Sequence, residues 1–222
     1  MTRAPHDPPP VHAPDASARA LARLAEHVVE LGEGAWVAWV RDVLPDHDAL
    51  RAELAATLPL RVETLRMGAR EVATPRRTSW HGEPGRTYAY SGRRFEPAPW
   101  THALLRIRAS VEERTGTLFD AALVNEYRDG RDAMGWHADD EPELGPRAPD
   151  DVLIASVSLG APRRFLLRHR RRPERLEWAL GEGDLFVMGG ATQRRWQHAI
   201  PRTARPVGAR VNVTFRLVRP SR

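Results

Sequence analysis

The sequence predicts a mainly β fold with flanking helices, built as a double-stranded β-helix of the jelly-roll or cupin-like kind. Two observations predict it. The second half of the chain contains eight short segments of strand-like composition, separated by glycine and proline turns. Helical spacing of apolar residues is confined to the first half, where the helices would brace one sheet. A barrel of this kind has a mouth in which a metal and small molecules bind.

The first part of the chain predicts a tail followed by helices. Residues 1–15 are rich in proline and predict a disordered tail. Apolar residues at helical spacing predict one helix over residues 16–31 and another over residues 45–58. A strand is expected between them, over residues 35–40. We therefore predict an N-terminal helical extension over residues 16–60.

The main domain is expected over residues 61–222. It opens with a hairpin of two strands, 62–67 and 70–73, followed by a loop rich in proline, arginine and aromatic residues. A third helix is predicted over residues 99–114, with a proline in its first turn. The eight strands expected after it are 121–127, 136–138, 152–159, 164–169, 176–180, 184–188, 197–200 and 210–218.

The composition limits the class of protein. The chain has 222 residues, 41% of them hydrophobic, which is enough for one domain with a core. The absence of cysteine excludes disulfides and zinc–thiolate sites. The sequence shows neither an apolar run of membrane-spanning length nor a secretory signal pattern, so we expect a cytoplasmic protein without a membrane partner. The sequence leaves the oligomeric state open, with a monomer as the default.

The positive charge favours an anionic partner. All 34 basic residues are arginines, and the net charge is +5. Such a balance favours nucleic acid first among partners. A GC-rich genome would also enrich arginine, so the charge alone does not decide the partner.

Three residues have the chemistry of a metal site: His137, Asp139 and, far downstream, His198. Two imidazoles and one carboxylate occupy one face of an octahedral metal and leave three positions open, as in the facial triad of non-haem Fe(II) oxygenases. On an extended strand the first two side chains point to the same face. The fold must then return the chain so that the second histidine joins them.

Two arginines, Arg210 and Arg216, follow soon after His198. A guanidinium near an open iron suits a dicarboxylate cosubstrate, because its planar fork binds a carboxylate through two parallel hydrogen bonds. Each feature alone has an ordinary explanation, since His-x-Asp pairs are common and strand arginines are mostly solvated. The order and spacing of the whole set favour a catalytic site.

A longer combined motif contains these residues: 125–130 (NEYRDG), 137–141 (HADDE), 154–160 (IASVSLG), His198 and 210–216 (RVNVTFR). Together with 75–77 (PRR), 87–92 (TYAYSG) and 99–100 (PW), it resembles the AlkB family of Fe(II)- and 2-oxoglutarate-dependent dioxygenases, which repair alkylated nucleic acids. The resemblance is closer to the branch with the animal DNA-repair homologues than to the founding bacterial enzyme. It covers roughly residues 60–218 and implies a dioxygenase core.

The resemblance implies a cofactor site. Fe(II) would be held by His137, Asp139 and His198, and O2 would be the second cosubstrate. The residues implied to bind 2-oxoglutarate are Asn125, Tyr127, Arg210, Thr214 and Arg216. Arg210 would bind the distal carboxylate, and Arg216 would lie near the iron.

The resemblance also implies a base site, with a nucleotide-recognition hairpin over residues 61–92. Asp140 and Glu141 would face the damaged base, which Tyr88 and Tyr90 would contact by stacking. Alternatively, the two carboxylates form an exposed turn and the two tyrosines pack in an ordinary strand.

Three further features point to contacts with nucleic acid. The basic pair Arg76 and Arg77 would lie beside the damaged base. Met67 at the hairpin tip would act as a wedge during base flipping or would simply pack under the hairpin. A basic cluster predicts contacts to phosphate, or else a solvated run of charge: Arg163, Arg164, Arg168, Arg170, Arg171 and Arg172.

The predicted function is oxidative demethylation of DNA bases such as 1-methyladenine and 3-methylcytosine, with release of formaldehyde. A second hypothesis keeps the oxygenase chemistry and places it on RNA, a protein or a small molecule. A third, a non-catalytic binding module, is disfavoured because the metal triad and both arginines are intact.

Overall fold

The computed structural model describes residues 16–67, 70–90, 93–144 and 148–219, without the side chains of 65–67, 70, 88–90 and 93–95. The tail predicted over residues 1–15 lies outside the described residues. In the described part of the chain, no helix is long and apolar enough to cross a membrane.

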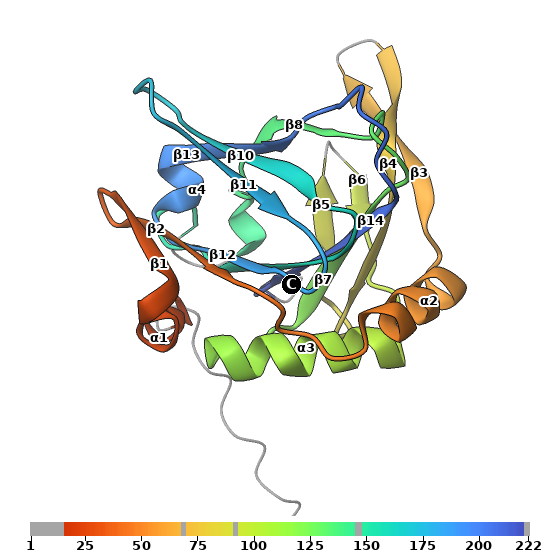
Figure 1. Cartoon of the computed structure of the whole chain (residues 1–222), viewed down its shortest axis with the longest axis horizontal. Coiled ribbons are helices and arrows are strands. Elements are labelled where there is room, and N and C mark those ends of the chain that lie inside the picture. Colours follow the sequence, from red (N-terminus) through yellow and green to blue (C-terminus); the bar gives the residue numbers. More distant parts are fainter. Residues whose placement is uncertain (1–15, 68–69, 91–92, 145–147, 220–222) are drawn as a thin grey trace, which may run out of the picture.

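Two antiparallel sheets face each other and form the body of the molecule (Figure 1). The larger contains, in spatial order, β1 (Val28–Gly32), β2 (Ala35–Val40), β12 (Leu185–Gly190), β9 (Ile154–Gly160), β14 (Arg210–Arg216), β7 (Ala121–Tyr127), β4 (Arg70–Gly82) and β3 (Arg61–Met67). The smaller contains β11 (Arg175–Leu180), β10 (Arg163–His169), β13 (Trp196–Ile200) and β8 (Met134–His137). A separate ribbon pairs β5 (Tyr88–Tyr90) with β6 (Arg93–Phe95).

The chain winds between the two sheets from β7 to β14. Strands β7, β9, β12 and β14 belong to the large sheet, whereas β8, β10, β11 and β13 form the small one. The central strand orders, β12-β9-β14-β7 and β11-β10-β13-β8, are those of a double-stranded β-helix. The predicted fold class, mainly β with flanking helices, is confirmed.

Three helices cover the outer face of the large sheet (Figure 1). They are α1 (Ala16–Arg23), α2 (His47–Thr57) and α3 (His102–Thr115), while a short α4 (Thr192–Arg195) joins β12 to β13. Two single turns of 3-10 helix occur at η2 (Ala25–His27) and η3 (Pro142–Leu144). The large sheet is therefore buried on both faces, by the helices on one side and by the small sheet on the other.

Strand β14 shows what this layering requires of the sequence. All seven of its residues are buried. Val211, Val213 and Phe215 pack against the helices, so the alternate residues point between the two sheets. These alternate residues are polar, and two of them are Arg210 and Arg216. A polar row buried in a sheet interior indicates a functional cavity rather than a core.

The N-terminal segment differs from the prediction. The helix expected over residues 16–31 ends at Arg23, and β1 occupies Val28–Gly32. β1 and β2 pair with each other, and β2 pairs with β12. The segment 16–60 is thus not purely helical, because two of its strands extend the large sheet. Apolar residues at helical spacing also suit a strand whose two faces are both partly covered, and local patterning does not separate the two cases.

Two other elements are longer or more regular than expected. The second strand of the first hairpin runs over Arg70–Gly82 rather than 70–73, because it pairs with β7 as well as with β3. The loop after it contains the β5–β6 ribbon. Both differences come from pairing with distant strands, which local sequence does not reveal.

Candidate active site

A cavity of about 240 Å³ opens between the two sheets. Residues from β7, β9 and β14 of the large sheet and from β8, β10 and β13 of the small sheet line its inner end. Residues of β3 and β4 line the cavity too, with Glu96 and Ala98, and because Arg61 and Glu96 are exposed, we call this the outer end. The inner end holds the predicted metal triad.

Strand pairing brings His137 and His198 together. The two residues are direct partners in the β8–β13 ladder, and their rings are 4.1 Å apart between centroids. β13 in turn pairs with β10, where Leu167 is the partner of His198. One antiparallel ladder therefore brings the second histidine back beside the first, as the metal site predicted from the sequence requires.

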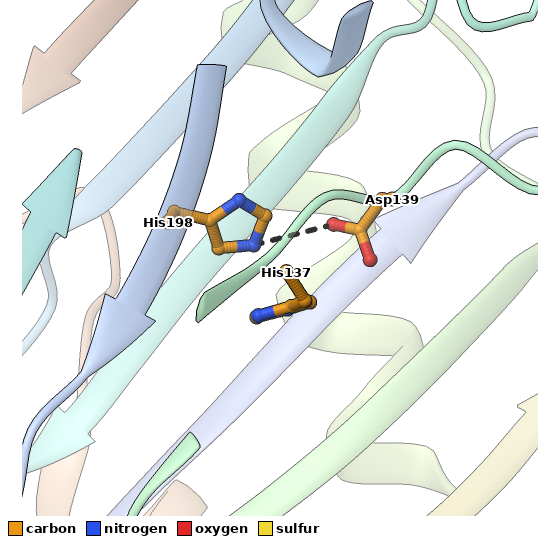
Figure 2. A group of neighbouring side chains, drawn as sticks. All are labelled: His137, Asp139 and His198. Carbon is orange, nitrogen blue, oxygen red and sulfur yellow. Dashed lines mark ion pairs between the residues drawn. The ribbon is translucent and has the colours of Figure 1, made fainter. Parts of the chain in front are cut away.

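Asp139 completes the group from just beyond the end of β8 (Figure 2). The strand predicted over residues 136–138 runs over Met134–His137, so Asp139 lies two residues beyond its end. The backbone N–H of Asp139 donates to Oε1 of Gln193 at 2.9 Å. Its Oδ2 lies 3.7 Å from Nε2 of His198, and its Oδ1 accepts a hydrogen bond of 2.5 Å from Nη2 of Arg216.

The protonation states suit a divalent metal. Nδ1 of His137 donates to the carbonyl oxygen of Gly135 at 2.9 Å, which leaves Nε2 with its lone pair. Burial lowers the pKa of His137, and it lowers the pKa of His198 to about 3. Burial opposes ionisation of Asp139, but its neighbours, Arg216 first among them, together hold the pKa of this carboxyl below its usual range.

One ligand atom from each of these three residues lies within 4.8 Å of the others. The group thus presents two neutral imidazoles and one carboxylate from one side, as a facial triad does. Among the described residues, this is the group of histidine and carboxylate side chains that lie close enough together to hold a metal ion.

Arg210 is the largest fully buried side chain of the described chain and is 1% exposed. Its Nη2 donates to Oγ of Ser158 at 2.7 Å, whereas its buried Nε and Nη1 form no hydrogen bond with the described residues. The ring of Tyr127 lies 5.4 Å from the guanidinium carbon. Burial lowers the pKa of Arg210 to about 10, so the group stays charged at neutral pH. A buried cation with unused donors in a cavity fits a carboxylate ligand.

The remaining residues implied in cosubstrate binding line the same cavity. Asn125 on β7 is the ladder partner of Asn212 on β14, and its Oδ1 accepts from Nε of Arg76 at 2.8 Å. Thr214 donates to Oδ1 of Asn212 at 3.0 Å. Together with Tyr127, these side chains form a polar wall on adjacent strands.

Only some of the residues predicted to contact the base line the cavity. Arg76, 5% exposed, and Glu141 line the cavity. Asp140 does not: it is exposed, and its carboxylate pairs with Arg170 at 2.8 Å. The side chains of Met67, Tyr88 and Tyr90 lie outside the described residues, although β3 and β5 contain their backbones.

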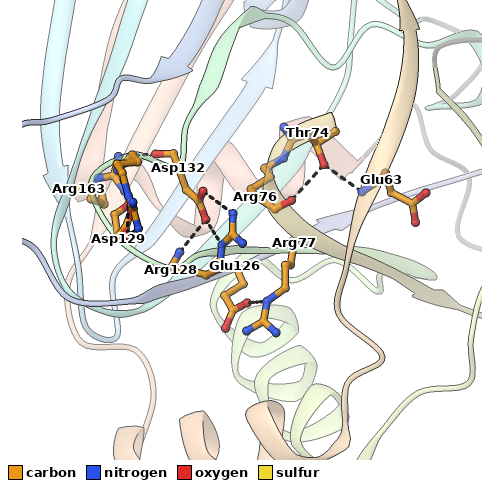
Figure 3. Close-up of polar contacts among 10 residues, drawn as sticks. Glu63, Thr74, Arg76, Arg77, Glu126, Arg128, Asp129, Asp132 and Arg163 are labelled. Atoms are coloured by element: carbon orange, nitrogen blue, oxygen red, sulfur yellow. Dashed lines mark hydrogen bonds and ion pairs between the residues drawn. The ribbon is translucent and has the colours of Figure 1, made fainter. Parts of the chain in front are cut away.

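Alternation along β4 explains why neighbouring arginines diverge. Arg76 points into the cavity, whereas Arg77 donates to the carboxylate of Glu126 (Figure 3). Thr74, which lies on the same face as Arg76, accepts from the backbone N–H of Glu63 at 3.1 Å and so ties β3 to β4. Of the basic pair seen in the sequence, one member therefore belongs to the site.

The basic cluster is only partly a surface feature. Arg163 is 3% exposed and donates to three backbone carbonyls, those of Asp129, Asp132 and Pro201. Figure 3 shows it beside the first two. Arg163 therefore holds the loop after β7 and does not reach phosphate. Arg164 pairs with the exposed Glu177.

Sequence reasoning missed three supporting residues. Gln193 is fully buried and fixes the backbone of Asp139. Ser158 anchors Arg210, and Ser156 accepts from Nδ2 of Asn212 at 2.6 Å. Ser156 and Ser158 alternate along β9, which was a usable signal for two polar residues on one face. Gln193 has no comparable signal, because α4 is only one turn long.

Comparisons with known proteins agree with this geometry. The model of the 2OG-Fe(II) oxygenase superfamily matches residues 38–216. The chain is 41% identical over 158 residues to the protein named DNA oxidative demethylase ALKBH2 of Mus musculus, covering 68% of this chain and 64% of that protein. It is 43% identical over 168 residues to alpha-ketoglutarate-dependent dioxygenase alkB homolog 3 of Homo sapiens, covering 70% and 57%. The chain thus spans somewhat more than half the length of these relatives.

An ALKBH2 of Arabidopsis thaliana is 31% identical over 223 residues, covering 86% of this chain and 68% of that protein. Among solved structures, one titled "The structure of OsALKBH1" superposes with a TM-score of 0.58 at 16% identity and covers 86% of this chain and 99% of that one. It supports the fold alone. The family match implies Fe(II), 2-oxoglutarate and O2 as cofactor and cosubstrates. The chain belongs to the 2OG-Fe(II) oxygenase superfamily and, within it, to the AlkB family.

Proposed function

We propose that this protein removes N-linked methyl groups from damaged DNA bases, of the 1-methyladenine and 3-methylcytosine type, by Fe(II)- and 2-oxoglutarate-dependent hydroxylation. The observation that carries the proposal is the position of Arg210. Its buried, charged guanidinium has two unused donors in the same cavity as the triad. Relatives named DNA oxidative demethylase, at about 40% identity, support the substrate class.

The donor set fits iron. His137, Asp139 and His198 would hold Fe(II) from one side and leave the cavity side open to ligands. Bound iron with 2-oxoglutarate and O2 supplies the oxidising power that hydroxylates a carbon–hydrogen bond. The protein holds the triad in its metal-binding state, since both imidazoles are neutral and Arg216 keeps Asp139 ionised.

The cosubstrate would lie along β14. Arg210 would bind its distal carboxylate through one of the two donors that it has free, Nε or Nη1, which point to opposite sides of the guanidinium. Arg216 already contacts the triad through Asp139 and so would lie at the iron-proximal end. Asn125, Tyr127 and Thr214 would complete the polar wall between the two arginines.

The base would enter through the outer end of the cavity. A methylated ring nitrogen is buried in a duplex, so the base must leave the stack before it can enter. Arg76 and Glu141 line the path, and β3 and β4 project the hairpin that contains Met67. We propose that this methionine takes the place of the extruded base.

The test uses anaerobically reconstituted Fe(II) protein, with 2-oxoglutarate, O2 and an oligonucleotide carrying one 3-methylcytosine, single-stranded or duplex. Mass spectrometry follows the loss of one methylene unit, and a second assay follows succinate. Demethylation with stoichiometric succinate supports the proposal. Activity on the single strand alone would remove the wedge role of Met67.

Other outcomes separate the hypotheses. Succinate without demethylation keeps the oxygenase and moves the substrate to RNA, a protein or a small molecule. If protein that is shown to hold iron forms neither succinate nor demethylated DNA, the hypothesis that it is an enzyme is overturned. The cytoplasmic location and the monomeric state stay predictions.

A further inference from the structure

The outer end of the cavity contains a carboxylate that the resemblance did not assign. Glu96 follows the β5–β6 ribbon, is exposed, and lines the same cavity as the triad. It therefore lies where the cavity opens, in the path of an entering base. From this position and the charges around it, we propose that Glu96 selects positively charged bases.

Backbone contacts fix the segment that carries Glu96. The N–H of Ala98 donates to the carbonyl of Trp80 at 2.9 Å, and the N–H of Gly82 donates to the carbonyl of Ala98 at 3.2 Å. Trp80 is buried and lines the cavity beside them. The segment is thus held against β4 and cannot drift away from the opening.

A buried histidine adds a third anchor. Nδ1 of His81 donates to the carbonyl oxygen of Pro99 at 2.8 Å, and because burial lowers the pKa of His81, its Nε2 is an acceptor for the hydroxyl of Ser79 at 2.6 Å. The imidazole is therefore oriented from both sides. It fixes the residue three positions after Glu96.

The carboxylate itself is oriented without losing its charge. The hydroxyl of Thr87, which is 6% exposed, donates to Oε1 of Glu96 at 3.1 Å. A neutral donor directs a carboxylate but leaves its charge in place, unlike a guanidinium. Within the described part of the chain, Glu96 forms no ion pair.

Most other charges lining the cavity already have partners. Arg61 pairs with Glu63 at 2.6 Å, and Arg216 binds Asp139. Arg76 donates to the amide oxygen of Asn125, which is neutral. In the proposed function, Arg210 faces the carboxylate of the cosubstrate. The charge of Glu96 thus remains to act on whatever enters the opening.

The negative charge of Glu96 attracts a positively charged base and has no such effect on a neutral base. 3-Methylcytosine is cationic at neutral pH, whereas 3-methylthymine carries the same methyl group on a neutral ring. Because Glu96 is exposed, we expect a modest preference of about two- to fivefold, weakened by salt. The inference rests on the proposed function, since it presumes that a base enters this cavity.

The experiment compares Glu96→Gln with the unchanged protein on two single-stranded oligonucleotides that differ only in carrying 3-methylcytosine or 3-methylthymine. It measures kcat/KM for each with the iron-loaded enzyme, and Kd for each by fluorescence anisotropy with the metal-free protein. The ratio of the two oligonucleotides cancels the phosphate contribution, which is common to both. Glu113→Gln, an exposed change on α3 at the outer face of the large sheet, is the control for net charge.

In Glu96→Gln we expect the cation-to-neutral ratio of kcat/KM to fall about two- to fivefold and the cation-to-neutral ratio of Kd to rise by the same factor, and we expect both ratios to stay unchanged in Glu113→Gln. An equal loss on both oligonucleotides, or no loss on either, overturns the proposal. If the unchanged protein demethylates neither oligonucleotide and does not distinguish them in Kd, the proposed function has failed and this inference fails with it. An active wild type with an unchanged ratio in Glu96→Gln rejects the inference alone.

Discussion

The two ends of the cavity are built differently. At the inner end, the two histidines and both arginines are held by ladders between adjacent strands, and every residue of β14 that lines the cavity is buried. At the outer end, the side chains of Glu96 and Arg76 are each held by a single hydrogen bond, and Glu96 is exposed. The comparison teaches that the proposed chemistry rests on the sheets, whereas the proposed substrate selection would depend on side chains that can change without disturbing them.

The largest effect is expected at the triad. His137→Ala removes one of two imidazoles, so Fe(II) binding and turnover should fall below detection while binding to unmodified DNA persists. Titration with Co(II), followed by its absorption, measures the metal site directly. A variant that loses DNA binding and its cooperative thermal unfolding as well would indicate misfolding instead.

Arg210→Met separates cosubstrate binding from folding. A buried charge that lacks part of its hydrogen bonding costs stability, so an apolar replacement of similar length should leave the melting temperature of the free protein equal or higher. The KM for 2-oxoglutarate should rise about 100-fold or more. Differential scanning fluorimetry with and without 2-oxoglutarate checks both: the ligand-induced rise in Tm should disappear. A retained rise would place the distal carboxylate elsewhere.

Gln193→Leu tests a support that lies behind the metal ligands. It removes the acceptor for the backbone N–H of Asp139, and we expect metal affinity to fall about 10- to 100-fold. Gln193→Glu keeps an acceptor at this position and should recover part of the loss. Equal Kd values for the metal in all three proteins would show that Asp139 needs no such support.

The lowered histidine pKa values predict a pH dependence of the metal-free protein. Unfolded histidines take up protons below about pH 6.5, whereas folded His198, with its pKa lowered to about 3, does not. The free energy of unfolding should therefore decrease as pH falls from 6.5 to 5, by about 2 kcal/mol for this residue. Urea unfolding at both pH values measures it, and His198→Asn should flatten the dependence.

The smallest effect is expected at Asp140, outside the cavity. Its exposed ion pair with Arg170 contributes little, so Asp140→Asn should change KM for a methylated oligonucleotide by less than about twofold. A larger change confined to the methylated oligonucleotide would mean that the carboxylate reaches the base after all. Asp140 would then have to be counted among the residues at the outer end of the cavity.

The sequence by itself determined the chemistry. The residue types of His137, Asp139 and His198 specify a metal, and the alternation of β14 specifies a strand with one polar face, because both follow from composition and a period of two. The positions of the later strands along the sequence were also predictable, from turns and from runs of β-branched residues. These are local properties, and local patterns carry them.

Only the tertiary structure decided which polar residues share the cavity. β1 was missed as a strand because its stability comes from pairing with β2, which pairs in turn with β12, and not from its own pattern. Asp140 and Glu141 are neighbours, yet one pairs with Arg170 outside and the other lines the cavity. Arg163 looked like a surface cation and is a buried anchor for a loop. The reason is common to all three: burial and partners depend on contacts between segments that are far apart in the chain, and a local sequence pattern contains no record of those contacts.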